Sequence, residues 1–189
     1  LSIQQKIFKN LEHGALKKVN GIVLHQTDSS SAAATLRAYQ TQKNGAHYLI
    51  DCDGTIYQTA SLEQKVWHVG KLQPRCKNEG TCSEEERKAI AALEAKPVSY
   101  GRRATLISRH EAKKAYPERY PSNADSIGIE VVGLHDEKKG YGPPTKKQKE
   151  SLDRLVNALL EKYNLTLKDV YAHGRIGRKM ESEAIHLGY

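Results

Sequence analysis

Two histidines, His25 and His173, follow short apolar segments at residues 21–24 and 170–172. Apolar runs of this length are typical of buried strands, so we expect each imidazole at the rim of a sheet, where open α/β folds bind ligands. Imidazole is a common neutral zinc ligand, and a catalytic zinc site uses three protein ligands with one position left for water. A histidine at a strand end can also merely pack beside the core. A metal site here therefore requires a third ligand.

The segment after His173 offers two carboxylates, Glu181 and Glu183, which lie eight and ten residues further along the chain. A carboxylate oxygen can complete a zinc site that two histidines begin. The same residues would also suit a solvated, charged tail. The residue types alone leave the choice between the two glutamates open.

Glu130 is unusual because it interrupts an otherwise apolar segment, residues 126–133 (SIGIEVVG). Burying a carboxylate among apolar side chains is costly, and burial perturbs its pKa. A carboxylate with a perturbed pKa is suited to general acid–base catalysis. The alternative is a glutamate that faces solvent from an edge strand, which the apolar flanks disfavour.

The elements that must position these side chains predict one α/β domain, residues 1–189, with a central mixed β-sheet flanked by helices. Strands are expected near residues 21–25, 126–133 and 169–173, and Asp53-Gly54 predicts a hairpin between residues 47–51 and 55–58. Helices are expected over residues 32–43 and after Thr145, where a capping box precedes an apolar stripe.

Two segments are predicted to lie outside this framework. Residues 1–19 form an N-terminal leader, in which Ile3, Ile7, Phe8 and Leu11 have the spacing of a short helix. Residues 71–124 are charged and rich in proline, and a capping box at Ser83 predicts a helix to about residue 95. We expect this second segment to be a helical insertion on the cleft side.

The bulk properties limit the classes of function. The chain has 189 residues and a net charge of +8, but no arginine-rich arm, so a cell-wall polyanion is a better partner than nucleic acid. No apolar run is long enough to span a membrane, and no signal peptide is visible. Cys76 and Cys82 can close a small loop, or they can be free thiols like Cys52. A disulfide would favour a periplasmic or extracellular location.

Five segments occur in an order that resembles the zinc N-acetylmuramoyl-L-alanine amidases. This family includes phage amidase lysozymes, a bacterial cytosolic anhydromuramyl amidase and animal peptidoglycan-recognition proteins. The segments are residues 23–25 (VLH), 46–57 (AHYLIDCDGTIY), 66–70 (VWHVG) and 123–130 (NADSIGIE), and His173 with Lys179. The resemblance covers roughly residues 20–70 and 123–189.

The resemblance implies a role for each matching residue. His25 and His173 match zinc ligands, and Glu130 matches the catalytic acid/base of the cytosolic branch. Lys179 matches the lysine that steadies the oxyanion. The expected substrate-binding residues are His47, Trp67 and His68.

This chain departs from the family pattern at two places. Phage members have a tyrosine where this chain has Ala46, so another group, with Glu130 as a candidate, would take its role. The third zinc ligand is cysteine in phage members, at the position of Glu181, and aspartate in the cytosolic branch, at the position of Glu183. We favour Glu183 because it precedes alanine, as the fixed glutamate of related secreted amidases does.

The resemblance implies a Zn²⁺-dependent enzyme that cleaves the amide between N-acetylmuramic acid and L-alanine in peptidoglycan or a muropeptide. The alternative is a non-catalytic peptidoglycan-recognition module, and a nucleic-acid-binding domain is more remote. The expected setting is periplasmic or extracellular, and antibacterial action is one candidate role. The insertion would shape one wall of the cleft or dock a partner, with an immunity or inhibitor protein as a candidate.

Overall fold

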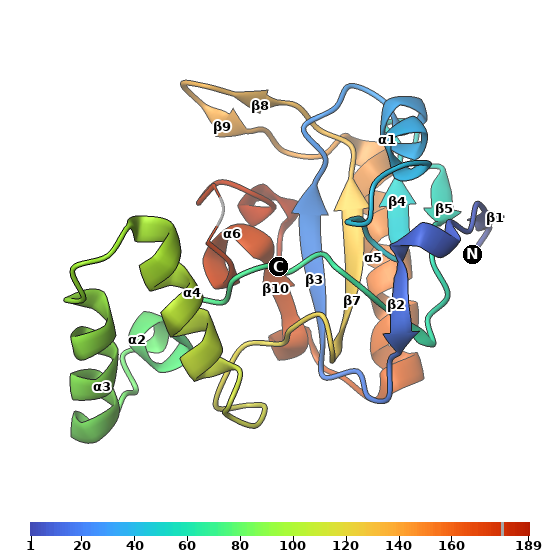
Figure 1. The fold of residues 1–189 in the computed structure, drawn as a ribbon. Coiled ribbons are helices and arrows are strands. Elements are labelled where there is room, and N and C mark those ends of the chain that lie inside the picture. Colours follow the sequence, from blue (N-terminus) through green and yellow to red (C-terminus); the bar gives the residue numbers. More distant parts are fainter. Residues whose placement is uncertain (179) are drawn as a thin grey trace.

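The central feature of the computed structural model, which describes residues 1–178 and 180–189, is a six-stranded mixed sheet (Figure 1). The inner strands β4, β7 and β3 and the edge strand β10 run parallel to one another. Strand β5 is antiparallel to β4. In spatial order the strands are β1 (Gln4–Gln5), β5 (Ile56–Gln58), β4 (Tyr48–Ile50), β7 (Ser126–Val131), β3 (Gly21–Gln26) and β10 (Val170–Ala172). The predicted α/β fold with a mixed central sheet is confirmed.

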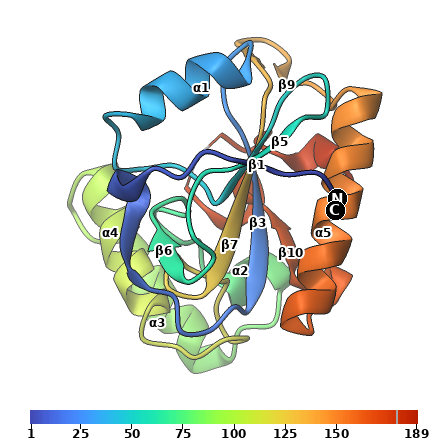
Figure 2. The ribbon, with the colours of Figure 1, turned by 90° about the vertical axis from the view of Figure 1, so that its right-hand side faces the viewer.

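Helix α5 (Lys146–Tyr163) covers one face of the sheet (Figure 2). The predicted capping box begins it: the Thr145 side chain accepts from the Gln148 N–H, and the Gln148 side chain accepts from the Thr145 N–H. Alternate strand residues and the apolar stripe of α5 form the main core between them. That core includes Ile22, Leu24, Ile127, Ile129, Leu152, Leu155, Val156 and Leu159.

The opposite face of the sheet carries His25 of β3 and Ser126 and Glu130 of β7. It lies toward β6 (Gln64–Val66), which pairs with β2 (Glu12–Ala15), while α1 (Ala32–Tyr39) follows β3 at the upper end of the sheet (Figures 1 and 2). Ser31 caps α1 by accepting from the Ala34 N–H. Helix α1 ends at Tyr39, four residues earlier than its composition predicts.

The N-terminal segment differs from its predicted helix. It forms strand β1, the 3₁₀ helix η1 (Lys9–Leu11) and strand β2, and these strands pair with β5 and β6. Leu11 is fully buried beside Tyr39 and Val66. Pairing with strands that are distant in sequence satisfies this backbone, and the local spacing of apolar residues carries no signal for such pairing.

The charged segment contains three helices, of which the sequence predicted one. They are α2 (Arg75–Glu79), α3 (Glu84–Glu94) and α4 (Tyr100–Glu111), and they lie to one side of the sheet (Figure 1). The predicted cap at Ser83 accepts from the Glu86 N–H, but the Glu86 carboxylate pairs with His110 and Lys114. Helix α4, capped by Ser99, has few apolar residues and was missed.

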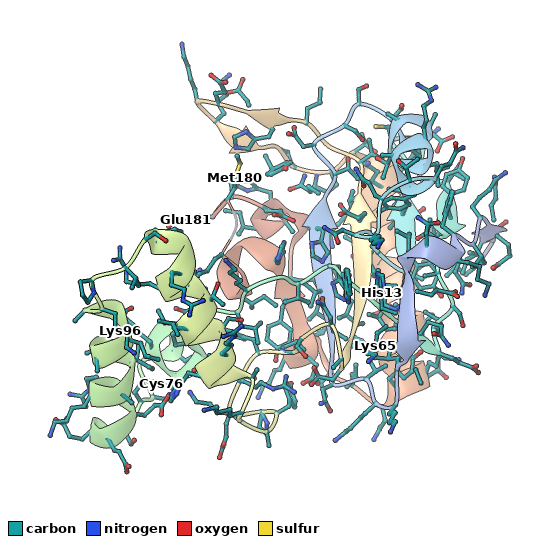
Figure 3. All side chains as sticks on the ribbon, in the orientation of Figure 1. His13, Lys65, Cys76, Lys96, Met180 and Glu181 are labelled. Atoms are coloured by element: carbon teal, nitrogen blue, oxygen red, sulfur yellow. A yellow bond between two sulfur atoms is a disulfide. The ribbon has the colours of Figure 1, made fainter. Side chains whose placement is uncertain are left out.

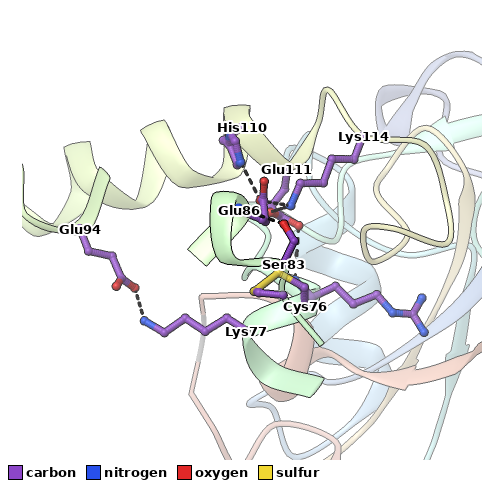
Figure 4. Close-up of a disulfide and its surroundings, with 10 residues drawn as sticks. Cys76, Lys77, Ser83, Glu86, Glu94, His110, Glu111 and Lys114 are labelled. Atoms are coloured by element: carbon purple, nitrogen blue, oxygen red, sulfur yellow. Dashed lines mark hydrogen bonds and ion pairs between the residues drawn. A yellow bond between two sulfur atoms is a disulfide. The ribbon is translucent and has the colours of Figure 1, made fainter. Parts of the chain in front are cut away.

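A disulfide joins Cys76 and Cys82, and Cys52 is free and exposed (Figure 4). This settles the question that the cysteine spacing left open. Among the residues that the structure describes, no helix is long and apolar enough to cross a membrane.

Except for η2 (Leu167–Asp169), the remaining elements lie near the carboxyl ends of β3 and β10. Strands β8 (His135–Asp136) and β9 (Gly140–Tyr141) form a small hairpin beyond the sheet, and η2 precedes β10. Helix α6 (His173–Ile176) follows β10 directly, and η3 (Ile185–Leu187) ends the chain. These segments bring the C-terminal loop beside the end of β3 (Figure 1).

Candidate metal centre and cleft

His25 and Glu130 are neighbours across the two central strands. They are register partners in the parallel pair β3 and β7, so their side chains leave the same face of the sheet. Their strand neighbours Leu24, Ile129 and Val131 point to the opposite face and join the core beneath α5. The strand pairing alone therefore places an imidazole and a carboxylate side by side.

His173 reaches the same place from the next strand. It is the first residue of α6, immediately after β10, and β10 pairs with β3. Its Nδ1 lies 2.8 Å from Oε1 of Glu183, and His25 Nδ1 lies 3.2 Å from the same oxygen. All three side chains are buried, and their ligand atoms lie within 4.8 Å of one another.

The structure distinguishes the two carboxylates that the sequence left as alternatives. Glu183 is buried against both histidines, whereas Glu181, which is labelled in Figure 3, is exposed. The backbone of Glu183 is tied back to α6, because Gly174 N donates to its carbonyl. Glu183 is thus the carboxylate that the fold brings to the histidines.

The electrostatics of Glu183 suit a site for a cation. Burial raises the pKa of this carboxyl group, but its close contacts with the His173 and His25 imidazoles outweigh burial and lower its pKa to about 2. The group is therefore an anion at neutral pH. One carboxylate oxygen and two imidazole nitrogens are a donor set that zinc accepts in catalytic sites.

The outer nitrogen of His173 supports this interpretation. Its Nε2 donates to the backbone carbonyl of Val69 at 2.8 Å. Since the carbonyl can only accept, Nε2 carries a proton, and a neutral His173 would present the lone pair of Nδ1 to a cation held beside Glu183. Ligand histidines in metal sites commonly have a carbonyl or carboxylate partner of this kind. The residues present therefore fit a zinc ion.

The cluster lies in a cleft of about 650 Å³. Six residues that the sequence singled out line this cleft together: His25, His173, Glu183, Glu130, Trp67 and His68. Lys179 lies outside the described residues. The cleft thus unites histidines from two strand ends with a carboxylate on the neighbouring strand.

Trp67 and His68 are adjacent in sequence but differ in their surroundings. Trp67 is 46% exposed, and its ring is stacked on His13 with the ring centroids 3.7 Å apart. His68 points inward, and its Nδ1 lies 3.0 Å from His25 Nε2. Burial and the neighbouring His25 hold the pKa of His68 well below its usual value. Trp67 is therefore exposed at the cleft, whereas His68 contacts the candidate ligand His25.

His47 is fully buried, which differs from the substrate-contacting position that the sequence predicted. Its Nδ1 accepts from the Gly128 N–H, and its Nε2 donates to the Gln64 carbonyl. Burial lowers its pKa to about 4, so the ring is neutral. In this position His47 supports β7 from beneath the cleft.

Sequence reasoning missed Gln26, the residue that follows His25. Its side chain accepts from the Ala184 N–H at 3.1 Å and donates to the Gly142 carbonyl at 3.0 Å. These bonds hold the segment that carries Glu183 against the end of β3. The sequence signal for this role is a polar glutamine placed directly after the candidate ligand His25, at the end of an apolar run.

Comparisons with known proteins agree with the fold and identify the family. A family model described as N-acetylmuramoyl-L-alanine amidase matches residues 15–183. No curated protein sequence matches the chain significantly.

Solved structures match over most of the chain. The catalytic domain of XlyA is 20% identical, with a TM-score of 0.57, and the match covers 95% of this chain and 88% of that one. PlyL is 17% identical, with a TM-score of 0.56 and coverage of 95% and 85%. AmpDh3 from Pseudomonas aeruginosa is 23% identical, with a TM-score of 0.55 and coverage of 86% and 54%. At these identities the likeness shows a shared fold.

Proposed function

Because the chain belongs to the N-acetylmuramoyl-L-alanine amidase family, we propose that it is a zinc enzyme that hydrolyses the amide between N-acetylmuramic acid and L-alanine of peptidoglycan. The observation that carries this proposal is the convergence of His25, His173 and Glu183 beside Glu130 in one cleft. A recognition module without catalysis has no need of a complete donor set next to a carboxylate.

Each residue has a distinct task in the proposed reaction. His25 and His173, through Nδ1, and the Glu183 carboxylate would hold the ion. A bound zinc ion supplies Lewis-acid activation of water and of the amide carbonyl. Glu130 would accept the proton of the attacking water and return it to the departing alanine nitrogen. By family resemblance, Lys179 would stabilise the developing oxyanion.

The substrate class follows from the cleft and the charge. Trp67 presents an exposed aromatic ring at the cleft, and such rings pack well against the apolar faces of sugars and peptides. The net charge of +8 favours the polyanionic cell wall. Together with the Cys76–Cys82 disulfide, these features support action outside the cytoplasm.

The direct test is digestion of purified sacculi, followed by mass spectrometry of the soluble products. We expect L-alanyl peptides and glycan chains with free lactyl groups, and no product after treatment with a chelator. Restoration by added zinc would complete the result. Binding to sacculi without any released peptide would instead identify a recognition module, and cleavage at another bond would overturn the proposed specificity.

A further inference from the structure

The side chain of His68 continues inward from the metal centre through a chain of hydrogen bonds. His25 Nε2 lies 3.0 Å from His68 Nδ1, and His68 Nε2 lies 3.2 Å from Ser126 Oγ. Ser126 Oγ in turn lies 2.6 Å from the carbonyl oxygen of Ser122. The chain therefore links a candidate ligand to a backbone carbonyl.

The carbonyl at the far end fixes the direction of every bond in this chain. The carbonyl of Ser122 can only accept, so the Ser126 hydroxyl donates its single proton to it. Ser126 Oγ must then accept from His68 Nε2, which leaves the lone pair of a neutral His68 on Nδ1. This lone pair accepts from His25 Nε2–H, so the remaining lone pair of His25 lies on Nδ1, the atom that faces Glu183.

The backbone at His68 and Val69 is also fixed by hydrogen bonds. The N–H groups of His68 and Val69 both donate to Oδ1 of Asn123, at 2.9 and 2.7 Å. The carbonyl of Val69 is the partner of His173 Nε2. The dipeptide His68-Val69 thus contacts Nε2 of both candidate histidine ligands, His25 and His173.

The packing leaves His68 little freedom to turn. Gly128 lies directly under its ring, and a Cβ atom built on Gly128 would lie 2.8 Å from His68 Nδ1. The absence of a side chain at Gly128 is therefore what allows the imidazole to reach His25. Trp67, one residue earlier, faces the opposite way, toward solvent and His13.

We propose that His68 is a positioning residue for the metal centre, and that Ser126 and the Ser122 carbonyl select the His25 tautomer that can bind zinc through Nδ1. This inference rests on the proposed zinc site and assigns His68 a role other than substrate binding. His68 and Ser126 act through His25 and do not touch the reacting atoms. The loss of a supporting partner of this kind weakens metal binding about 10–100-fold.

The test compares Ser126→Ala, His68→Ala and Gly128→Ala with the wild type and with Trp67→Ala as the matched control. Zinc affinity is measured by competition with a chromophoric chelator, and folding is checked by circular dichroism. We expect zinc dissociation constants about 10–100-fold higher for the first three variants and an unchanged constant for Trp67→Ala. Gly128→Ala removes no polar group, so its effect would report displacement of the His68 ring.

A second readout follows the tautomer directly. In protein labelled with ¹⁵N-histidine, NMR should show His25 protonated at Nε2 in the wild type and a mixture of tautomers in Ser126→Ala. Wild-type zinc affinity in all three variants, with a raised KM for His68→Ala, would overturn the inference and make His68 a substrate contact. Wild-type protein that binds no zinc would instead overturn the proposed function.

Discussion

At the scale of single residues, Glu183 and Glu181 form a matched pair for mutagenesis, because both are glutamates and only their positions differ. Glu183 is buried against two histidines, and Glu181 is exposed. We expect Glu183→Gln to lower zinc content strongly in elemental analysis, because a neutral amide replaces the anionic ligand. Glu181→Gln should keep about one zinc ion per chain. The reverse pattern would assign the third ligand to Glu181.

Glu130 shares a face with His25 but stands outside the donor cluster. If it moves the proton in the reaction, Glu130→Gln should reduce kcat on muropeptides by about 10²–10⁴-fold. Zinc content should stay at the wild-type level, since no ligand is lost. A variant that keeps zinc and also keeps wild-type turnover would remove Glu130 from the mechanism.

At the scale of elements, the sequence predicted the parts of the fold whose signal is local. Strands β3 and β7 appear as apolar runs, and α5 appears as a capped apolar stripe. The N-terminal strands and helix α4 were not predicted, because their stability comes from partners distant in sequence. The same limit applies to the site: residue types indicated His25 and His173, but only the register of β3 and β7 sets Glu130 beside His25.

The three helices of the insertion are joined by a partly buried ionic cluster (Figure 4). Glu86 on α3 pairs with His110 of α4 and with Lys114, which also pairs with the fully buried Glu111. Glu111 in turn accepts from the Arg75 N–H at the start of α2. Burial acts to raise the pKa of Glu86, but its hydrogen bonds to Lys114 and His110 lower it below 4.5 overall.

The sign of this shift predicts how stability changes with pH. A carboxyl group with a lowered pKa in the folded protein stabilises the fold above its unfolded value of 4.5, and this contribution is lost as the pH falls through the folded value. We expect Glu86→Gln to have a lower thermal midpoint than the wild type at pH 7. The gap between the two thermal midpoints should shrink as the pH falls. Calorimetry from pH 7 to about pH 3 would measure this. A difference that stays constant over this range would contradict the assignment.

At the scale of the whole molecule, the metal centre and the insertion depend on different forces. The candidate centre lies on the buried sheet, and the core between this sheet and α5 is mainly apolar, with Gln148 and Ser151 of α5 also buried. The insertion lies to one side, and its buried apolar side chains are Leu72, Ile90, Ala104, Ile107 and Tyr120. Yet Gln73 N donates to Ile176 O and Arg178 N to Lys71 O, so the segment before α2 contacts the loop that leads to Glu183. The insertion is thus connected to the site through its first residues.

This arrangement predicts that the disulfide stabilises the insertion without forming the metal centre. Closing the short loop between Cys76 and Cys82 should contribute about 2 kcal/mol by restricting the unfolded chain. The double variant Cys76→Ser, Cys82→Ser should therefore unfold about 4–8 °C lower in calorimetry. Its zinc content should equal that of the wild type, because the ligands are carried by β3, α6 and the C-terminal loop. Cys52→Ser is the control for removal of a thiol, and loss of zinc from the double variant alone would show that the insertion holds the site together.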